Sequence, residues 1–255
     1  MAIQRDHWII CREPRRGPRT RLFCFHHAGG SASAFASWPK LLDETIELCA
    51  VQTPGRENLF SQPRYRSIDA LLPELLPRLK PWLDRPFAFF GHSLGGLVAF
   101  AAAHRLKEEG GPACELLIVS ACLPPHLPRT TSALVDAPEP QLLASMRELG
   151  SASASAFENP ELRALLLPVL RDDLAMAGSL RSGCWPPLER PIAAFGGATD
   201  NSVQPERLEA WRSYSGSGFS LRIFPGGHFY IEESRDALVG AIRTALIAGE
   251  RASPG

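Results

Sequence analysis

The sequence predicts an α/β protein in which a mostly parallel, doubly wound sheet carries helices on both of its faces. Short apolar segments alternate along the chain with longer stretches of helical periodicity, an alternation typical of parallel strands joined by crossover helices. Several of the short segments are apolar throughout, as strands covered on both faces should be. The length of 255 residues suits one large α/β unit, so a single domain over residues 1–255 is expected.

Six strands and three principal helices are expected from these patterns. The strand segments are apolar and short, whereas the helical segments repeat their apolar residues with a longer period. The expected strands are 21–25, 46–52, 86–91, 115–121, 191–196 and 219–224, and the expected helices are 94–109, 205–214 and 232–248.

A further helical pattern, at residues 67–83, is interrupted by prolines. The segment has the apolar period of a helix but contains Pro73, Pro77 and Pro81. A proline inside a helix removes a backbone hydrogen bond and costs about 3 kcal/mol. We therefore expect a bent or interrupted helix here.

The longest gap between expected strands extends over about residues 122–190. It contains no strand pattern, and helical periodicity appears at 141–149 and 160–180, joined by the Ser/Ala-rich residues 151–156. A gap of this length is too long for a plain loop, so we expect a helical insertion that covers one end of the sheet as a lid. The lid is either a static layer or a mobile one, because a Ser/Ala-rich connection offers little packing.

Composition excludes several classes of protein. Lys plus Arg number 27 and Asp plus Glu number 27, so the basic excess of a nucleic-acid-binding protein is absent. The N-terminus lacks the apolar core of a signal peptide. Residues 86–103 carry no charged side chain, but His92, Ser93 and three glycines interrupt them, which favours strand, turn and helix over a membrane span. The six cysteines show no C-x-x-C spacing, so free thiols and a cytoplasmic location are expected.

Residues 91–95 read Gly-His-Ser-Leu-Gly and fit the G-x-S-x-G pattern of a nucleophile elbow. The motif follows an expected apolar strand and precedes an expected apolar helix, which is the context that an elbow requires. So tight a turn needs small residues two positions either side of the serine, and Gly91 and Gly95 supply them. Ser93 then lies at the carboxyl edge of the sheet and at a helix N-terminus, whose dipole favours negative charge. Ser93 is the candidate nucleophile.

A base and an acid are needed to activate this serine. In this type of fold the chain order is serine, acid, histidine. Of seven histidines only His228 lies late in the chain, in a Gly-rich loop that can return to the elbow. The acid should follow a strand that precedes the strand before His228. Asp200 lies in a turn after the expected strand 191–196. Asp172 and Asp173 compete for this role, but they fall in the expected insertion helix, so Asp200 is preferred.

Two backbone amides are candidates for stabilising an oxyanion. The Leu94 amide follows the nucleophile at the start of a helix. The second donor should come from the loop after strand 21–25, which reads His-His-Ala-Gly-Gly, and the Ala28 amide is preferred. The adjacent His26 and His27 do not indicate a metal site, because neighbouring side chains point apart and no third ligand is nearby.

Taken together, these segments resemble the type II (external, editing) thioesterases of polyketide and nonribosomal peptide biosynthesis, within the α/β-hydrolase superfamily. The resemblance extends over nearly the whole chain. The serine motif alone indicates only an α/β-hydrolase, whereas the His-Ala-Gly-Gly and Pro-Gly-Arg-Glu segments narrow the family. The segments are, in chain order, residues 27–30, 38–39, 52–57, 91–95, 125–128, 197–200 and 225–229.

The resemblance implies hydrolysis of acyl thioesters from the phosphopantetheine arm of carrier proteins, which clears aberrant or stalled acyl groups. It implies a triad of Ser93, Asp200 and His228 that acts through an acyl-enzyme, with Ala28 and Leu94 as oxyanion donors. No metal or organic cofactor is expected. Acyl or peptidyl carrier protein domains are the expected partners of a monomer, with no nucleic acid and no membrane. The alternatives left open are an acyltransferase with a non-water acceptor, a small-molecule carboxylesterase and a non-catalytic carrier-binding module.

The sequence departs from the family pattern at a few positions. His26 stands where proline is common, and Leu94 replaces the usual methionine. The second change should spare an oxyanion donor, because the donor is a backbone N–H. Ala101 stands where glutamate is frequent, which puts in doubt an acid partner for Arg56.

Overall fold

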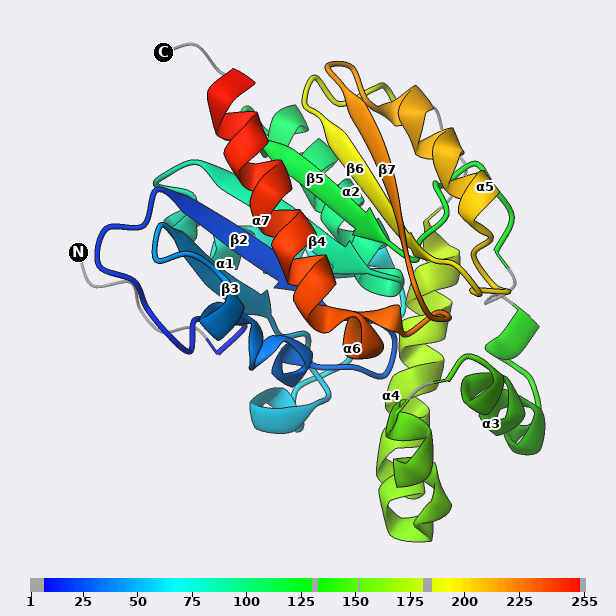
Figure 1. Ribbon diagram of the computed structural model, residues 1–255. Coiled ribbons are helices and arrows are strands. Elements are labelled where there is room, and N and C mark those ends of the chain that lie inside the picture. The colour runs from blue at the N-terminus through cyan, green and yellow to red at the C-terminus, as the bar shows by residue number, and fades with distance from the viewer. Residues whose placement is uncertain (1–6, 130–132, 151, 181–184, 253–255) are drawn as a thin grey trace.

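The computed structural model describes residues 7–129, 133–150, 152–180 and 185–252. Seven strands form one sheet in the order β1-β3-β2-β4-β5-β6-β7 (Figure 1), and only the β1–β3 pair is antiparallel. The predicted mostly parallel sheet is therefore confirmed. The strands are β1 (Ile9–Ile10), β2 (Thr20–Phe25), β3 (Ile46–Val51), β4 (Phe87–His92), β5 (Leu116–Ser120), β6 (Ile192–Gly197) and β7 (Phe219–Phe224).

The six predicted strands are confirmed to within one residue at each end. Every residue of β2 to β6 is buried, which explains why these segments are mostly apolar. The charged exceptions, Arg21 of β2 and Glu47 of β3, form an ion pair at 2.6 Å. Strand β1 was not predicted. It is only two residues long and pairs Ile9 with Val51 and Ile10 with Ala50 at the edge of the sheet, so it carries no pattern of its own.

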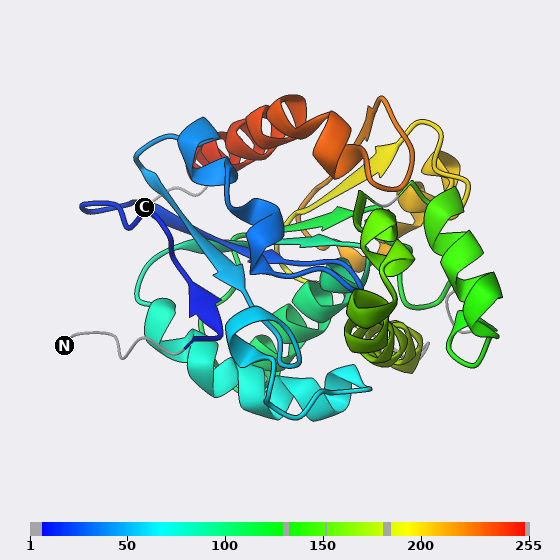
Figure 2. The same cartoon turned by 90° about the horizontal axis from the view of Figure 1, so that it is seen from below.

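Helices cover both faces of the sheet, as Figures 1 and 2 show. One apolar core packs beneath α1 (Ile68–Leu79), α2 (Leu94–Glu108) and α5 (Pro205–Leu208), together with the 3-10 helix η7 (Glu209–Tyr214). The other core packs beneath α7 (Arg235–Ala252), the short α6 (Tyr230–Glu233) and two 3-10 turns, η1 (Ala32–Phe35) and η2 (Trp38–Leu41). The doubly wound arrangement follows from these two apolar layers.

The proline-rich helix is less disrupted than predicted. Helix α1 continues through Pro73 and Pro77 to Leu79, and Pro81 lies in the following 3-10 turn, η4 (Lys80–Trp82). The predicted interruption is therefore absent from the helix itself. Both internal prolines are exposed, so water can bind the carbonyl groups that lose their N–H partners. The opposite face of the helix is buried, and this packing outweighs the cost of the prolines.

The segment between β5 and β6 forms the lid. It contains α3 (Glu139–Glu148), the 3-10 run η6 (Ala152–Glu158) and α4 (Pro160–Ser179), which extend beyond the carboxyl edge of the sheet in Figure 1. The two predicted helices are confirmed, whereas the Ser/Ala-rich link is helical from Ala152 onward, and Ser151 lies outside the described residues. The second half of α4 is buried, but Leu162 and Leu165 in its first half are 45% and 49% exposed.

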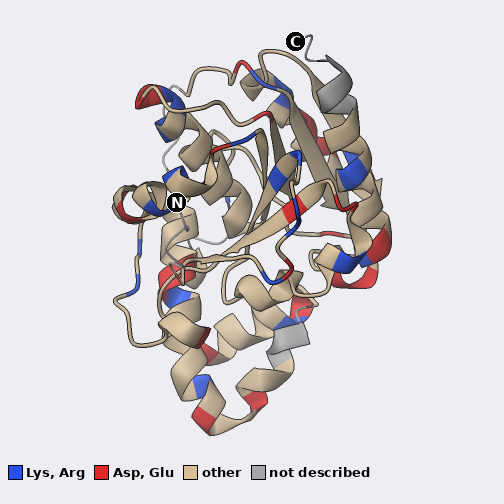
Figure 3. Ribbon diagram, turned by 90° about the vertical axis from the view of Figure 1, so that its left-hand side faces the viewer, with Lys and Arg blue, Asp and Glu red and all other residues tan. Residues whose placement is uncertain are grey.

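In the described part of the chain, no helix is long and apolar enough to cross a membrane. Residues 86–103 form β4 and α2, as predicted. Acidic and basic residues are interspersed over helices and loops and do not gather by sign on one element (Figure 3).

Candidate active site

Ser93 occupies a sharp turn between β4 and α2. Its φ of 54° and ψ of −117° lie in a region that residues other than glycine rarely adopt. A Cβ atom at Gly91 would lie 2.1 Å from the Gly95 carbonyl oxygen, and one at Gly95 would lie 2.1 Å from the Phe25 carbonyl oxygen. The two glycines of the motif are therefore a steric requirement of the turn.

The three predicted triad residues lie in one chain of hydrogen bonds at the carboxyl edge of the sheet. His228 Nε2 lies 3.1 Å from Ser93 Oγ, and His228 Nδ1 lies 2.8 Å from Asp200 Oδ2. These distances allow His228 to take a proton from Ser93 while Asp200 orients the ring. The competing acids, Asp172 and Asp173, bind arginines instead.

Asp200 lies in the predicted turn, but the hydrogen bonds that hold its carboxylate were not predicted. Its Oδ1 accepts hydrogen bonds from the Ser202 amide at 2.8 Å, the Ser202 hydroxyl at 2.7 Å and the Val203 amide at 3.0 Å. Burial raises the pKa of Asp200, but the hydrogen bonds from His228, Ser202 and Val203 outweigh it and leave the pKa below its ordinary value. Ser202 Oγ also lies 3.0 Å from His228 Nδ1. The sequence signal was Asp-x-Ser, which is typical of an aspartate-capped turn.

The two predicted oxyanion donors border the same cavity as Ser93 and His228. Leu94 is the first residue of α2, so its amide has no acceptor within the helix. Ala28 lies in the loop after β2, where His27 Nδ1 donates to the Ala28 carbonyl at 2.9 Å. The Gly30 amide donates to the His27 carbonyl at 3.0 Å and closes this loop into a turn.

The cavity beside Ser93 has a volume of about 630 Å³ and mostly apolar walls. A cavity of this size suits a small organic group. Its walls come from the elbow and from both lid helices, so the lid sets the shape of the site. The apolar wall residues include Leu94 and Leu97 of α2, Met146 of α3, and Leu174 and Ala177 of α4.

Three further buried histidines lie at the carboxyl ends of β2 and β4. Burial lowers the pKa of His26 to about 3, that of His27 to about 4 and that of His92 well below its ordinary value. His26 donates to the His27 carbonyl at 2.8 Å through Nδ1, and its Nε2 lies 2.9 Å from Thr53 Oγ1. All three rings are therefore neutral at pH 7 and contribute packing and hydrogen bonds instead of charge.

These neutral histidines predict a loss of stability in mild acid. An unfolded histidine takes up its proton near pH 6.5, whereas His26 and His27 stay neutral in the folded protein down to about pH 3 and 4. The unfolded chain therefore binds more protons below pH 6.5, and the free energy of unfolding falls as the pH falls. At pH 5 the loss is about 2 kcal/mol for each such histidine.

The variant His26→Gln tests this dependence. It should reduce the difference between the free energies of unfolding at pH 7 and pH 5 by about 2 kcal/mol, as measured by urea denaturation. His7→Gln, at an exposed histidine, is the control and should leave the difference unchanged. An identical pH dependence in His26→Gln and the wild type would contradict the assignment.

One group of potential metal ligands lies outside this cavity. Within the described ranges, Cys11, Glu47 and Cys49 place their ligand atoms within 4.8 Å of one another. Glu47 already accepts hydrogen bonds from Arg21 Nε at 2.6 Å and from the Arg15 amide at 3.0 Å. The guanidinium beside this carboxylate opposes the binding of a metal cation. The β1–β3 pairing brings the free thiols of Cys11 and Cys49 close together. Their spacing along the chain could not reveal this proximity.

Comparisons with known proteins point to one family. A family model described as a thioesterase domain matches residues 20–246. The gramicidin S biosynthesis protein GrsT of Aneurinibacillus migulanus is 33% identical over 236 residues, which cover 92% of each protein. RedJ, a thioesterase of the prodiginine pathway in Streptomyces coelicolor, superposes with a TM-score of 0.85 at 33% identity over 91% of this chain and 88% of its own. YbtT, a type II thioesterase of the yersiniabactin pathway, gives 0.84 at 30% identity over 95% and 99%.

Proposed function

This chain belongs to the thioesterase family of α/β-hydrolases, and we propose that it clears aberrant or stalled acyl groups from carrier proteins of polyketide or nonribosomal peptide assembly lines. The similar proteins named above act in gramicidin S, prodiginine and yersiniabactin biosynthesis, which supports this class of pathway. The structural observation that carries the proposal is the hydrogen-bonded chain of Ser93, His228 and Asp200 beside an apolar cavity.

Acylation begins when His228 removes the proton of Ser93. The Ser93 oxygen attacks the thioester carbonyl, whose oxygen becomes negative between the Ala28 and Leu94 amides. Asp200 accepts a hydrogen bond from His228 Nδ1 and stabilises the imidazolium that forms. The tetrahedral intermediate collapses as the C–S bond breaks, and His228 returns its proton to the departing pantetheine thiolate.

Deacylation repeats these steps with water. His228 removes a proton from a water molecule, whose oxygen attacks the acyl ester on Ser93. The same two amides stabilise the second oxyanion. Collapse of this intermediate releases the free acid and restores the Ser93 hydroxyl. The proposed reaction uses only side chains and amides of the protein and needs neither metal nor organic cofactor.

The proposed substrate is an acyl group carried on the long phosphopantetheine arm of an acyl or peptidyl carrier domain, and the proposed enzyme acts as a monomer. The apolar cavity accepts the acyl group, and Met146 and Leu149 of the lid segment border it. Contacts between the enzyme and the carrier domain lie far from the reacting carbonyl, and they add binding energy that coenzyme A cannot supply. Carrier-bound thioesters should therefore be hydrolysed with a higher kcat/KM than the same acyl groups on coenzyme A.

A panel of acyl groups, each loaded on a carrier protein and on coenzyme A, tests this proposal. Mass spectrometry should show the free acid and the unloaded carrier, with faster hydrolysis of the carrier-bound series. The same panel supplied with amine and alcohol acceptors distinguishes hydrolysis from transfer. Amide or ester products would identify an acyltransferase, and cleavage of simple esters with no cleavage of thioesters would identify a carboxylesterase.

A further inference from the structure

We propose that Asp173, on the lid helix α4, is a positioning residue that holds the oxyanion loop, residues 27–30, in its working geometry. The proposal rests on the proposed function, because it takes the Ala28 amide as an oxyanion donor. Asp173 acts through the backbone and through Arg56, and not through the triad, where His228 is bound to Asp200.

The Asp173 carboxylate is buried, with 1% of its surface exposed, and binds the oxyanion loop directly. Its Oδ2 accepts a hydrogen bond from the Gly29 amide at 2.7 Å. Gly29 directly follows Ala28, so this contact fixes the peptide unit beside the proposed oxyanion donor. A carboxylate forms a strong, short hydrogen bond with a backbone N–H, which makes this anchor firmer than a contact between neutral groups.

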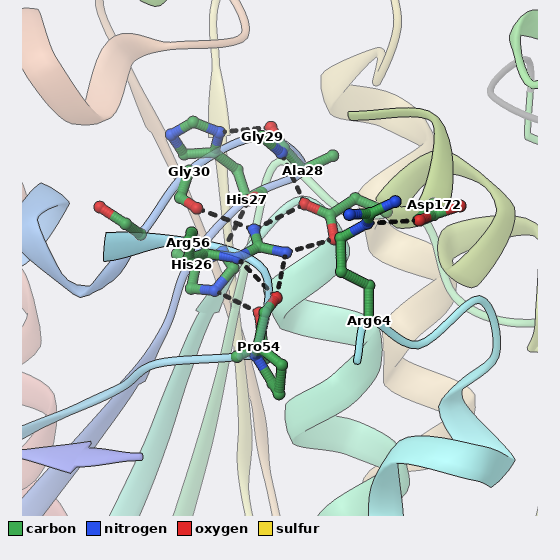
Figure 4. A network of polar contacts seen from close by, with 12 residues as sticks. His26, His27, Ala28, Gly29, Gly30, Pro54, Arg56, Arg64 and Asp172 are labelled. Carbon is green, nitrogen blue, oxygen red and sulfur yellow. Dashed lines mark hydrogen bonds and ion pairs between the residues drawn. The ribbon is translucent and has the colours of Figure 1, made fainter. Parts of the chain in front are cut away.

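Arg56 links the Asp173 carboxylate to a second point of the oxyanion loop, the Gly30 carbonyl. Its Nη1 donates to Asp173 Oδ2 at 2.7 Å and its Nη2 to Asp173 Oδ1 at 2.8 Å, a two-point ion pair. The same Nη1 donates to the Gly30 carbonyl at 2.9 Å. Figure 4 shows the Arg56 guanidinium between Gly30 and Pro54, whose carbonyl lies 3.4 Å from Arg56 Nη2. One buried ion pair thus joins the lid, the oxyanion loop and the loop after β3.

This arrangement supplies the acid that the sequence left in doubt. Ala101 stands where the family often has glutamate, so Arg56 lacked an evident partner in sequence analysis. The structure provides Asp173 from the lid instead. Burial raises the pKa of Asp173, but the charge and hydrogen bonds of Arg56 outweigh it, so the carboxylate stays ionised.

Loss of the anchor should affect the transition state more than the substrate. The Ala28 amide must meet an oxygen that becomes negative only when Ser93 attacks, and a misplacement of about 1 Å can reduce the rate about 10²-fold. The apolar walls of the cavity do not include Asp173, so binding of the acyl group is largely preserved. The expected signature is a fall in kcat with little change in KM.

The neighbouring Asp172 provides a matched control on the same helix. It binds Arg64 at 2.7 Å and Arg66 at 3.0 Å, side chains that are 38% and 63% exposed. Its contacts attach α4 to the segment before α1 and do not reach the oxyanion loop. Asp172→Asn therefore removes a carboxylate that anchors the lid without removing the anchor of the Gly29 amide.

The test compares Asp173→Asn with Asp172→Asn in the full chain, using an acyl-carrier substrate and an alkyl trifluoromethyl ketone. This ketone forms a tetrahedral adduct with a reactive serine and places an oxyanion in the same position. For Asp173→Asn, kcat should fall and the inhibition constant should rise, each about 10²-fold, with KM within about threefold. For Asp172→Asn all three should stay within about threefold of the wild type.

The thermal unfolding transition of the variant and the thioester activity of the wild type keep the outcomes distinct. If Asp173→Asn does not fold, as judged by its thermal unfolding transition, Arg56→Lys takes its place, because lysine keeps the charge but loses the two-point pairing. Equal kcat and inhibition constants in folded Asp173→Asn and Asp172→Asn would overturn this inference alone. A wild-type protein that is inactive on every thioester would overturn the proposed function instead.

Discussion

The variant Ser93→Ala should lose thioester turnover by about 10⁶-fold and form no acyl-enzyme, while its fold stays intact. The hydroxyl borders the cavity and lies 3.1 Å from His228 Nε2, so its loss removes the nucleophile and leaves a base with nothing to activate. Alanine keeps the Cβ atom of the turn, so the packing of Gly91 and Gly95 is unaffected. Intact-protein mass spectrometry after treatment with a fluorophosphonate, together with steady-state turnover, measures both effects.

Ser145 supplies the control for this experiment because it also borders the cavity but lies on the lid helix α3. Ser145→Ala should react with the fluorophosphonate and turn over thioesters at nearly the wild-type rate. Undiminished turnover in Ser93→Ala would contradict the proposed mechanism as a whole. A non-catalytic carrier-binding module would show no labelling even in the wild type.

The variant Asp200→Asn should reduce kcat by up to about 10⁴-fold. In the wild type, the Ser202 and Val203 donors bind Asp200 Oδ1, and His228 Nδ1 faces Oδ2. If the asparagine oxygen keeps those donors, its NH₂ group faces His228 and favours the tautomer that carries a proton on Nε2. That tautomer cannot accept the proton of Ser93. Single-turnover acylation rates measure the effect directly.

Comparison among three aspartates locates the catalytic acid. Asp172→Asn should be nearly active, Asp173→Asn should lose about 10²-fold and Asp200→Asn should lose the most. A fully active Asp200→Asn beside a dead Asp173→Asn would show that the acid had been assigned to the wrong residue. Because the three substitutions are chemically identical, differences among them reflect position.

The features that the sequence predicted well are those with a strict local rule. Strands buried on both faces are mostly apolar, so β2 to β6 were found almost to their ends. The elbow needs glycines at fixed distances from Ser93, and the clashes that a Cβ would make at Gly91 and Gly95 explain that requirement. The parallel register then brings the loops after β4, β6 and β7 to one edge, which is why Asp200 and His228 could be placed beside Ser93.

The features that the sequence did not reveal depend on contacts between distant residues. The ion pair of Arg56 with Asp173 spans 117 positions, and no local pattern links the two residues. Strand β1 exists because β3 offers an edge, and α1 passes through its prolines because its other face is buried. Each depends on tertiary packing that overrides local preference.

The anchoring of α4 also limits how the lid can move. Asp172 and Asp173 attach its second half to the loops beneath, whereas its first half is partly exposed. A movement of the whole helix would break both sets of ion pairs and release the Gly29 amide. Opening that preserves them is confined to α3, η6 and the first half of α4, a narrower set of elements than the sequence predicted.

The β7 edge of the sheet should affect the association of molecules at high concentration. Its outer side has no partner strand in the described part of the chain, and Leu221 and Ile223 on it are 36% and 38% exposed. An open edge with apolar side chains favours pairing between molecules. The formal net charge is zero at pH 7, so electrostatic repulsion between copies is weakest near neutrality. Colloidal stability should therefore be lowest in neutral buffer and should improve toward alkaline pH, where the buried neutral rings of His26, His27 and His92 do not reduce the free energy of unfolding.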